Sequence, residues 1–385
     1  MKFQFFHLMP WDTFPAESPE WPVGNKDFDP VIGTGLYETY INTMAFAEEC
    51  EFDAVGCNEH HYSPFGLMTN ANLIGAALTQ RTKNIKLAMT GSLVPILNPI
   101  RVAEEYAMID VMSGGRLMAG ILRGIPHEYV AYNVSPDESR QRLEEATSLI
   151  LKSWTEPEPF GWEGKFYKFR AISIWPKPYQ KPYPTIIMSA SNKESAKSAA
   201  RNYATMGLAL IPDLKSAKEL IDIYMETAIQ SGWQPTSENI LVGLNTCISE
   251  NSEEAKEELA KGTAYFGKVL MGGPRTAQKI VLQKSRYFSS EEENKVFMNR
   301  LKAVKQRTLE ESIDAGVILC GNPDDVISQI KNVQNQLGCG WINMNMKIGN
   351  LPNESVYRSM KLFKKHIRPI FPKQNTIETH SEFAA

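Results

Sequence analysis

Cysteine is scarce in this chain, and neither sign of charge is in excess. The 385 residues include 5 cysteines, an odd number without any C-x-x-C pair. This argues against a disulfide framework and against a cysteine zinc site. Lys and Arg number 41 against 44 Asp and Glu, which gives a formal net charge of −3. That balance offers no attraction for the phosphates of a nucleic acid, so we expect no nucleic-acid partner.

Long hydrophobic runs are also missing. No segment has the roughly 18 consecutive apolar residues of a membrane span. The N-terminal sequence MKFQFFHLMPW has one lysine and a short apolar run that ends at Pro10, unlike a secretory signal peptide. Hydrophobic residues make up 43% of the chain, which is enough for a large core. We therefore expect a cytoplasmic protein with reduced thiols and no membrane partner.

The Gly-rich turn G-x-G-x-x-G of dinucleotide-binding sheets occurs nowhere in the chain. Instead, short apolar runs alternate with segments of helical periodicity. Eight runs are predicted to be strands, near residues 3–9, 52–57, 85–93, 117–122, 185–190, 207–211, 240–248 and 341–346. Most of them are followed by a predicted helix. This alternation favours the α/β class and a closed (β/α)8 TIM barrel with insertions.

Two stretches interrupt the alternation. Residues 155–184 hold five prolines and the aromatic sequence WEGKFYKF, which predicts a hairpin excursion. Residues 253–311 form a long, charged insertion, which we interpret as a lid over the barrel. We expect a single barrel domain over residues 1–372. The polar residues 373–385 are predicted to be a disordered tail.

Histidines are concentrated where a barrel enzyme carries its chemistry, directly after the strands. His7, His60, His61 and His127 each follow a predicted strand. The adjacent pair His60 and His61, in NEHHYSPFG, provides the best catalytic candidates. A zinc-dependent barrel hydrolase that uses Glu59 with these histidines is an alternative. It has less support, because neither H-x-H nor H-E-x-x-H is present, and we predict no metal site.

A second set of residues suits a phosphate group. Arg123 directly follows the fourth strand in ILRG, and Arg140 opens the next long helix. Ser191, Asn192 and Ser195 begin the helix after the fifth strand. Helix N-termini offer free N–H groups and partial positive charge, and arginine adds bidentate contacts. These five residues therefore predict a cofactor that carries a phosphate.

In this order, the motifs resemble those of the bacterial luciferase-like, flavin-dependent monooxygenases. The matching pieces are CEFDAVGCNEHHYSPFG, GSLVPILNPIRVAEEYAMIDVMSGGRL, GILRG, SASNKES, CGNPDD and SMKLFKKHIRP. They extend over residues 1 to about 372. The resemblance implies a barrel that binds reduced FMN without a covalent bond. It also implies that the flavin reacts with O2 through a C4a-peroxide and that a small organic substrate is oxygenated.

The resemblance assigns roles to individual residues. It places His60 at the reactive edge of the flavin, and it places Arg123 and Arg140 on the phosphate. It gives Ser191, with Glu194 or Ser195 nearby, to the phosphate loop. Thr90 and Gly91 align with a non-prolyl cis peptide that packs beneath the flavin. Leu122 stands where luciferase has a reactive cysteine, so light emission is not implied.

Partners and alternatives follow from the same reasoning. We expect reduced flavin to come from a separate NAD(P)H:FMN reductase, since no dinucleotide motif is present. The resemblance implies a homodimer formed through early helices, near residues 36–52 and 71–82. We expect the loop at 11–34 and the 253–311 insertion to shape the substrate pocket. The family resemblance therefore does not identify the substrate. A deazaflavin-dependent hydride-transfer oxidoreductase and a non-catalytic flavin-binding protein are the alternative functions.

Overall fold

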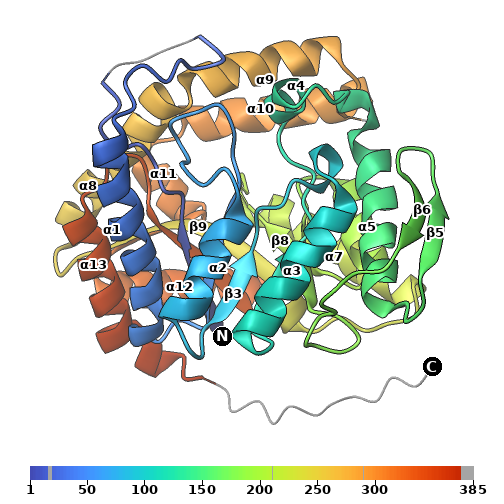
Figure 1. Cartoon of the computed structure of the whole chain (residues 1–385). Coiled ribbons are helices and arrows are strands. Elements are labelled where there is room, and N and C mark those ends of the chain that lie inside the picture. Colours follow the sequence, from blue (N-terminus) through green and yellow to red (C-terminus); the bar gives the residue numbers. More distant parts are fainter. Residues whose placement is uncertain (16–19, 210, 289, 374–385) are drawn as a thin grey trace.

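A closed parallel barrel forms the centre of the molecule (Figure 1). The computed structural model describes residues 1–15, 20–209, 211–288 and 290–373. The barrel strands in spatial order are β1 (Lys2–His7), β2 (Ala54–Cys57), β3 (Lys86–Met89), β4 (Leu117–Gly120), β7 (Thr185–Ser189), β8 (Thr205–Leu208), β9 (Ile240–Ile248) and β11 (Trp341–Lys347). Parallel pairing of β11 with β1 closes the ring. These are the eight strands expected from the sequence, so the predicted barrel is confirmed.

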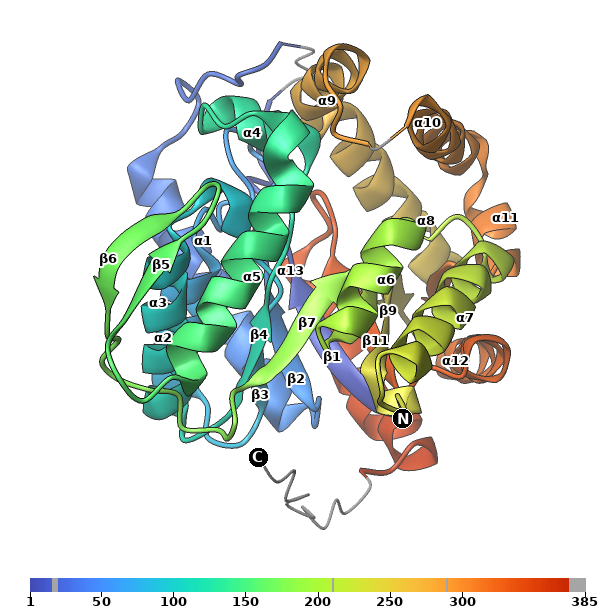
Figure 2. The ribbon, with the colours of Figure 1, turned by 90° about the vertical axis from the view of Figure 1, so that its right-hand side faces the viewer.

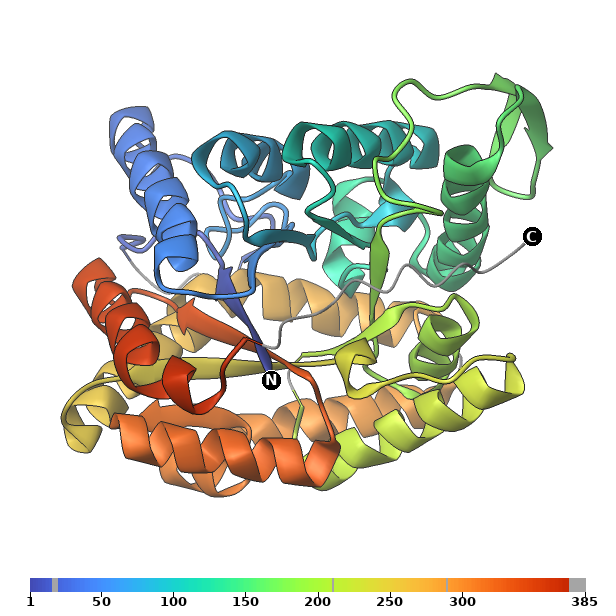
Figure 3. The same cartoon turned by 90° about the horizontal axis from the view of Figure 1, so that it is seen from below.

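Helices surround the strands on the outside (Figures 1 and 3). They are α1 (Pro30–Glu49), α2 (Ala71–Arg81), α3 (Pro99–Ser113), α5 (Ser139–Thr155), α6 (Lys193–Arg201), α7 (Leu214–Gln230), α12 (Pro323–Leu337) and α13 (Asn353–Leu362). Polar residues begin them, since Asp29, Asn70 and Asn98 each accept a hydrogen bond from a first-turn N–H. The core between strands and helices includes Phe52 stacked on Phe363, with ring centroids 4.2 Å apart. This packing fixes the outer faces of the strands.

The inward faces of the strands change character along the barrel axis. Six buried side chains fill the N-terminal end: Ala54, Ala88, Met118, Ile187, Leu241 and Trp341. Glycines follow one step further along several strands, including Gly56 and Gly243. The interior is therefore packed at one end and opens toward the carboxyl ends of the strands.

The excursion at residues 155–184 contains an antiparallel hairpin of β5 (Phe160–Glu163) and β6 (Lys168–Ile172), which lies outside α5 (Figure 2). One carboxylate holds its turn in place. Glu145 of α5 accepts hydrogen bonds from the backbone N–H groups of Lys165, Phe166 and Tyr167. These contacts lower the pKa of Glu145 although its burial opposes them. The hairpin is thus held against the barrel by hydrogen bonds to Glu145 of α5.

The 253–311 insertion is helical. It consists of α8 (Ser252–Tyr265), a π-turn (Phe266–Leu270), α9 (Gly272–Lys284), α10 (Glu291–Gln306) and α11 (Leu309–Asp314). Figures 1 and 2 place α9 and α10 above the same end of the barrel as α4 (Pro126–Ala131). Since α4 follows β4, this is the end where the strands finish. The insertion therefore covers the carboxyl end of the barrel.

The remaining features of the fold are an additional short strand, the cysteines and the C-terminal residues. A ninth strand that the sequence pattern does not predict, β10 (Ile318–Gly321), pairs with the end of β9. All five cysteines are buried and unpaired. Within the part of the chain that the structure describes, no helix combines the length and apolar character needed to cross a bilayer. The expected tail lies outside the described residues, apart from Lys373.

Candidate active site

Exposed residues on the inside of the barrel mark an open chamber at its carboxyl end. Six inward-facing side chains from different strands are partly or fully exposed there: Phe6, Thr90, Ser189, Ala209, Asn245 and Asn345. A residue inside a closed barrel reaches solvent only where the barrel interior is open. We define these residues and His60 as lining the chamber. Active sites of barrel enzymes lie at this same end.

His60 pairs with a buried carboxylate. Its Nδ1 lies 3.0 Å from Oε1 of Glu128, which is fully buried, while the His60 side chain is 22% exposed. The second oxygen of Glu128 accepts the backbone N–H of Ile125 at 2.8 Å. With both oxygens accepting, Glu128 places a proton on Nδ1 and leaves Nε2 as the proton-accepting nitrogen. His60 can therefore take or give a proton in the chamber.

His61 points into a different network. Its Nε2 lies 3.2 Å from Glu59 Oε1 and its Nδ1 lies 3.1 Å from the Tyr132 hydroxyl. His61 and Glu59 are both buried. Burial raises the pKa of Glu59, although the hydrogen bond from His61 opposes this. His61 is thus a bridge between a buried carboxylate and a more exposed tyrosine, with neither ring nitrogen left over.

His7 and His127 are buried neutral histidines. Burial lowers the pKa of His127 to about 4 and lowers that of His7 well below its ordinary value. His7 Nδ1 accepts the backbone N–H of Met9 at 2.9 Å, which turns the chain after β1. His7 is the last residue of β1 and His127 lies in α4 after β4, and neither is exposed in the chamber.

His60, His61 and Glu59 are not arranged as the ligands of one zinc ion. His60 and His61 contact different carboxylates, Glu128 and Glu59. Within residues 1–15, 20–209, 211–288 and 290–373, no group of three or more His, Cys, Asp or Glu side chains could hold a metal ion. Adjacent histidines after a strand thus diverge rather than converge.

The two arginines predicted for a phosphate lie near each other. Burial lowers the pKa of Arg140, and the charge of Arg123 lowers it further. Arg140 Nη2 is buried and has no hydrogen-bond partner among the described residues. Arg123 donates to the carbonyl of Tyr287 at 3.2 Å, and its guanidinium lies 3.9 Å from the centre of that ring. Two neighbouring guanidinium groups with an unused donor suit an anion.

The start of α6 supplies the rest of the predicted phosphate site. Ser195 Oγ accepts the backbone N–H groups of Ser191 and Asn192, both at 3.0 Å. Asn192 Oδ1 accepts the N–H of Ser195, so these residues cap the helix. Asn192 Nδ2 is buried without a partner in the described part of the chain. The charges of Glu293 and Glu194 oppose the lowering of the Arg140 pKa.

The donors of these residues fit a phosphate group. The unpaired nitrogens of Arg140 and Asn192 are donors, and a phosphate offers acceptor oxygens to both. The negative charge of a bound phosphate would offset the repulsion between the guanidinium groups of Arg123 and Arg140. Buried donors without a partner among the described residues thus occur both at Arg140 and at the start of α6, and the grouping of the five residues into one phosphate site stays a prediction.

The segment after β3 differs from expectation. In the described residues the cis peptide bonds all precede proline: Trp21–Pro22, Trp175–Pro176 and Lys181–Pro182. The expected cis bond between Thr90 and Gly91 is therefore wrong, and this bond is trans. Thr90 Oγ1 donates to the carbonyl of Cys57 at 2.7 Å in this conformation, and a non-prolyl cis bond costs about 2.5–4 kcal/mol. Gly91 is needed for close packing, since a Cβ there would lie 2.6 Å from that of Ala71.

One motif behind the family resemblance is structural. Arg116, at the end of the D-x-x-S-x-GR segment, is buried and donates to carbonyls of Thr79, Thr82, Ile85 and Ser113. Its guanidinium therefore closes the loop that joins α2 to β3. This motif holds the barrel together and takes no part in the chamber.

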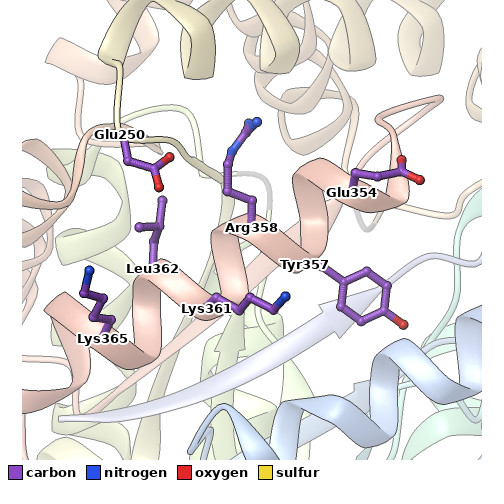
Figure 4. A pocket seen from close by; sticks show the side chains of 7 residues that line it. All are labelled: Glu250, Glu354, Tyr357, Arg358, Lys361, Leu362 and Lys365. Carbon is purple, nitrogen blue, oxygen red and sulfur yellow. The ribbon is translucent and has the colours of Figure 1, made fainter.

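A surface groove lies elsewhere, on the outer helical layer. It has a volume of about 530 Å³ and is lined by Glu250, Glu354, Tyr357, Arg358, Lys361, Leu362 and Lys365 (Figure 4). Arg358 pairs with Glu254 at 3.3 Å and with Glu258. Its charge is thus compensated locally, and the groove lacks the histidines and unpaired donors of the chamber.

Sequence reasoning missed several site residues. Glu128 lies three residues into a short helix that begins with proline, a place where an acidic residue is typical of a simple helix cap. Glu59 was considered only as a zinc ligand. Tyr132 and Tyr287 come from loops whose path depends on tertiary packing. The alternation of Asn343 and Asn345 in WINMNM was a readable signal of a polar inward face.

Comparison with known sequences identifies the family. Residues 29–338, well over half of the chain, match the family model described as luciferase-like monooxygenase. The chain belongs to the luciferase-like monooxygenase family. The resemblance stated from the motifs is thereby confirmed.

Two relatives of this family member have described activities. The alkanal monooxygenase alpha chain of Photobacterium leiognathi is 26% identical over 221 residues, which cover 57% of this chain and 62% of that protein. The oxygenase component of the flavin-dependent trigonelline monooxygenase of Acinetobacter baylyi is 26% identical over 238 residues, 60% of this chain and 66% of that protein. The match thus spans about half to two thirds of the length of such curated relatives.

Solved structures share the whole fold. Monooxygenase RslO1 from Streptomyces bottropensis has a TM-score of 0.75 at 25% identity, over 97% of this chain and 100% of that one. The oxygenating constituent of 3,6-diketocamphane monooxygenase from Pseudomonas putida, in complex with FMN, has a TM-score of 0.72 at 18% identity, over 96% and 98%. An F420-dependent secondary alcohol dehydrogenase has a TM-score of 0.68 at 16% identity, over 97% and 99%. The last two likenesses concern the fold alone.

Proposed function

We propose that this chain is the oxygenase component of a two-component flavin-dependent monooxygenase. It uses reduced FMN and O2 to oxygenate a small organic substrate. The observation that carries this proposal is the buried, unpaired donor Nη2 of Arg140, which feels the charge of Arg123 and lies on α5, the long helix that follows β4. When bound, reduced flavin supplies the electrons that reduce O2.

The residues of this chain have separate tasks in the proposal. Arg123, Arg140 and the start of α6 bind the phosphate and so orient the cofactor toward the chamber. His60, oriented by Glu128, gives or takes a proton through Nε2. The helical insertion above the carboxyl end of the barrel limits the access of water to the chamber. The side chains that line the chamber then select the substrate.

A separate NAD(P)H:FMN reductase is part of the proposal. The chain has no G-x-G-x-x-G motif for a dinucleotide. The relative from Acinetobacter baylyi is named an oxygenase component, which supports a division of labour between two proteins. Reduction of the flavin on one protein and oxygenation on another is consistent with non-covalent binding.

The test is an anaerobic titration with reduced FMN, followed by mixing with O2. Binding of reduced FMN, with O2 consumption that substrate candidates couple to product, supports the proposal. The alternative is a deazaflavin-dependent hydride transferase, and the likeness of the fold to the F420-dependent dehydrogenase is its support. Tight binding of reduced F420 without O2 consumption would replace the proposal by that alternative. Flavin binding with no turnover of any kind would indicate a non-catalytic flavoprotein.

Replacing Arg123 by alanine is expected to weaken the binding of reduced FMN about tenfold or more. The change removes a charge-assisted contact that contributes about 1.5–3 kcal/mol. Anaerobic fluorescence titration measures the Kd. Arg201→Ala, at an exposed position at the end of α6, is the matched control and should leave the Kd unchanged. An unchanged Kd in Arg123→Ala would remove Arg123 from the phosphate site.

We expect a homodimer, with α2 and neighbouring helices in the interface. Large apolar side chains are exposed on α2 and α3: Leu73 is 70% exposed, and Met108, Val111 and Met112 are between 44% and 48% exposed. Exposed apolar side chains on these two neighbouring helices suit a symmetric contact with a second copy. Light scattering at micromolar concentration should give twice the chain mass of 43.3 kDa. Leu73→Glu combined with Met112→Glu should give the monomer mass, and a monomeric wild type would contradict the expectation.

A further inference from the structure

Four carboxamide side chains line one side of the barrel interior. Gln4 of β1, Asn245 of β9, and Asn343 and Asn345 of β11 all face inward, and we call them the carboxamide wall. Strand register places Gln4 beside Asn343 and Asn245 beside Asn345. Asn345 Nδ2 donates to Asn245 Oδ1 at 2.9 Å. The wall is therefore continuous across three neighbouring strands.

Much of the hydrogen-bonding capacity of the wall is unused. Both amide atoms of Gln4 are buried without a partner among the described residues, as are Oδ1 of Asn343 and Oδ1 of Asn345. Native proteins satisfy nearly all buried polar atoms, with water or a ligand where no protein group serves. Two of these four atoms belong to Gln4, which is fully buried, and the other two belong to Asn343 and Asn345, which are partly exposed and can meet a ligand.

Two glycines leave space for the side chains of the wall themselves. Gln4 Nε2 lies over Gly56, where a Cβ would come within 2.2 Å of it, and Asn343 Nδ2 lies over Gly243. Barrel interiors are usually filled by bulky branched side chains at this level. Here Asn245, Asn343 and Asn345 are partly exposed, so the chamber extends to them.

The chemistry of the wall defines what it recognises. None of its four side chains carries a charge. Two carboxamides that share one hydrogen bond keep an unused C=O on one and unused N–H groups on the other, whichever way each amide is turned. This pair complements a group in which an N–H stands next to a C=O. A saturated hydrocarbon would leave every one of these atoms unpaired.

We propose that the carboxamide wall is a binding subsite for a neutral amide-type edge, an N–H next to a C=O. The inference rests on the proposed function in one respect, namely that the reaction takes place in the chamber at the carboxyl end of the barrel. Such an edge occurs on the pyrimidine ring of a flavin and on lactam, imide or carboxamide substrates. The wall lies on β9, β11 and β1, across the barrel from the arginines that follow β4. The subsite is thus separate from the phosphate site.

The test uses Asn245→Leu combined with Asn345→Leu, which removes both partners of the shared hydrogen bond. The matched control is Asn332→Leu combined with Gln336→Leu, an exposed amide pair of 2.7 Å on α12. The probes are FMN, followed by fluorescence, and 2-piperidone, a simple lactam, followed by calorimetry. We expect the Kd of at least one probe to rise tenfold or more in the wall variant and to stay unchanged in the control.

The two probes identify the source of the edge. A loss confined to FMN assigns the wall to the flavin ring, and a loss confined to 2-piperidone assigns it to the substrate. Unchanged Kd values for both, in a variant with a wild-type melting temperature, overturn the proposal. Asn345→Asp serves if the double variant does not fold, because it keeps the shape and removes the N–H groups. Binding of 2-piperidone that depends on the wall, without any FMN binding, would instead reject the proposed function and keep the subsite.

Discussion

Replacement of His60 by alanine is expected to reduce product formation by a factor of about 10² to 10⁴, while the Kd of reduced FMN stays within a few-fold of wild type. His60 lines the chamber on the loop after β2, whereas Arg123 and Arg140 follow β4. Loss of the imidazole therefore removes a proton donor or acceptor without touching the phosphate site. Oxygen electrode and peroxide assays should show that the O2 consumed by the variant is released as hydrogen peroxide.

Two further variants sharpen this prediction. Glu128→Gln keeps the side-chain volume but offers Nδ1 of His60 an amide in place of a buried carboxylate. We expect a smaller loss of product than in His60→Ala, together with an altered pH profile. His366→Ala, at an exposed position, should behave as wild type. Normal coupling of O2 to product in His60→Ala would make His60 a structural residue, and the role would not pass to His61, whose two ring nitrogens are occupied, or to His7, which is fully buried.

The barrel could be predicted from the sequence because local patterns and tertiary structure agree. Each of the eight strands is a short apolar run that is followed by a helical segment or a turn, and each is buried in the barrel. Strand β10 escaped because its four residues follow a helical insertion and pair only with the end of β9. A short strand that depends on one distant partner has no local signature.

The site was predictable in part for a similar reason. His60, Arg123 and Ser191 directly follow strands, and a barrel brings such positions to one end whatever the details of its loops. Glu128 and Tyr132 could not be assigned, because the contact of each with a histidine depends on how α4 packs across the barrel mouth. The cis bond expected at Thr90–Gly91 came from the family resemblance alone, and no local pattern in the sequence distinguishes a cis from a trans bond there.

A buried ion pair joins the loop after β1 to the end of β11. Lys347 is fully buried, and its Nζ donates to Oδ2 of Asp12 at 2.8 Å and to the carbonyl of Leu351 at 2.5 Å. The Tyr40 hydroxyl donates to the carbonyl of Pro10 at 2.8 Å and lies 3.1 Å from the same Asp12 oxygen. These contacts fix the start of the segment between β1 and α1, which is shorter than the predicted loop at 11–34 because α1 begins at Pro30. The geometry of the barrel mouth thus depends on one buried ammonium group.

Asp12→Asn is expected to lower the free energy of unfolding by about 3–5 kcal/mol at neutral pH, because it leaves the ammonium of Lys347 buried without a counter-charge. Urea unfolding followed by circular dichroism measures the change. Glu253→Gln breaks an exposed pair with Lys256 of 2.7 Å and should cost less than about 1 kcal/mol. Asp12→Asn combined with Lys347→Met should recover most of the loss, because no charge is then left buried.

The deficit of Asp12→Asn should narrow as the pH rises toward 10.5, the ordinary pKa of lysine. Burial lowers the pKa of Lys347, and Asp12 raises it in opposition, so the substitution lowers this pKa further. Between the folded-state pKa and 10.5 the unfolded chain binds more protons than the folded chain, so stability rises with pH. This window begins at a lower pH in the variant than in wild type, which is why the two curves converge. A deficit that is constant from pH 7 to pH 10 would show that the loss comes from packing around Asp12 and not from the charge of Lys347.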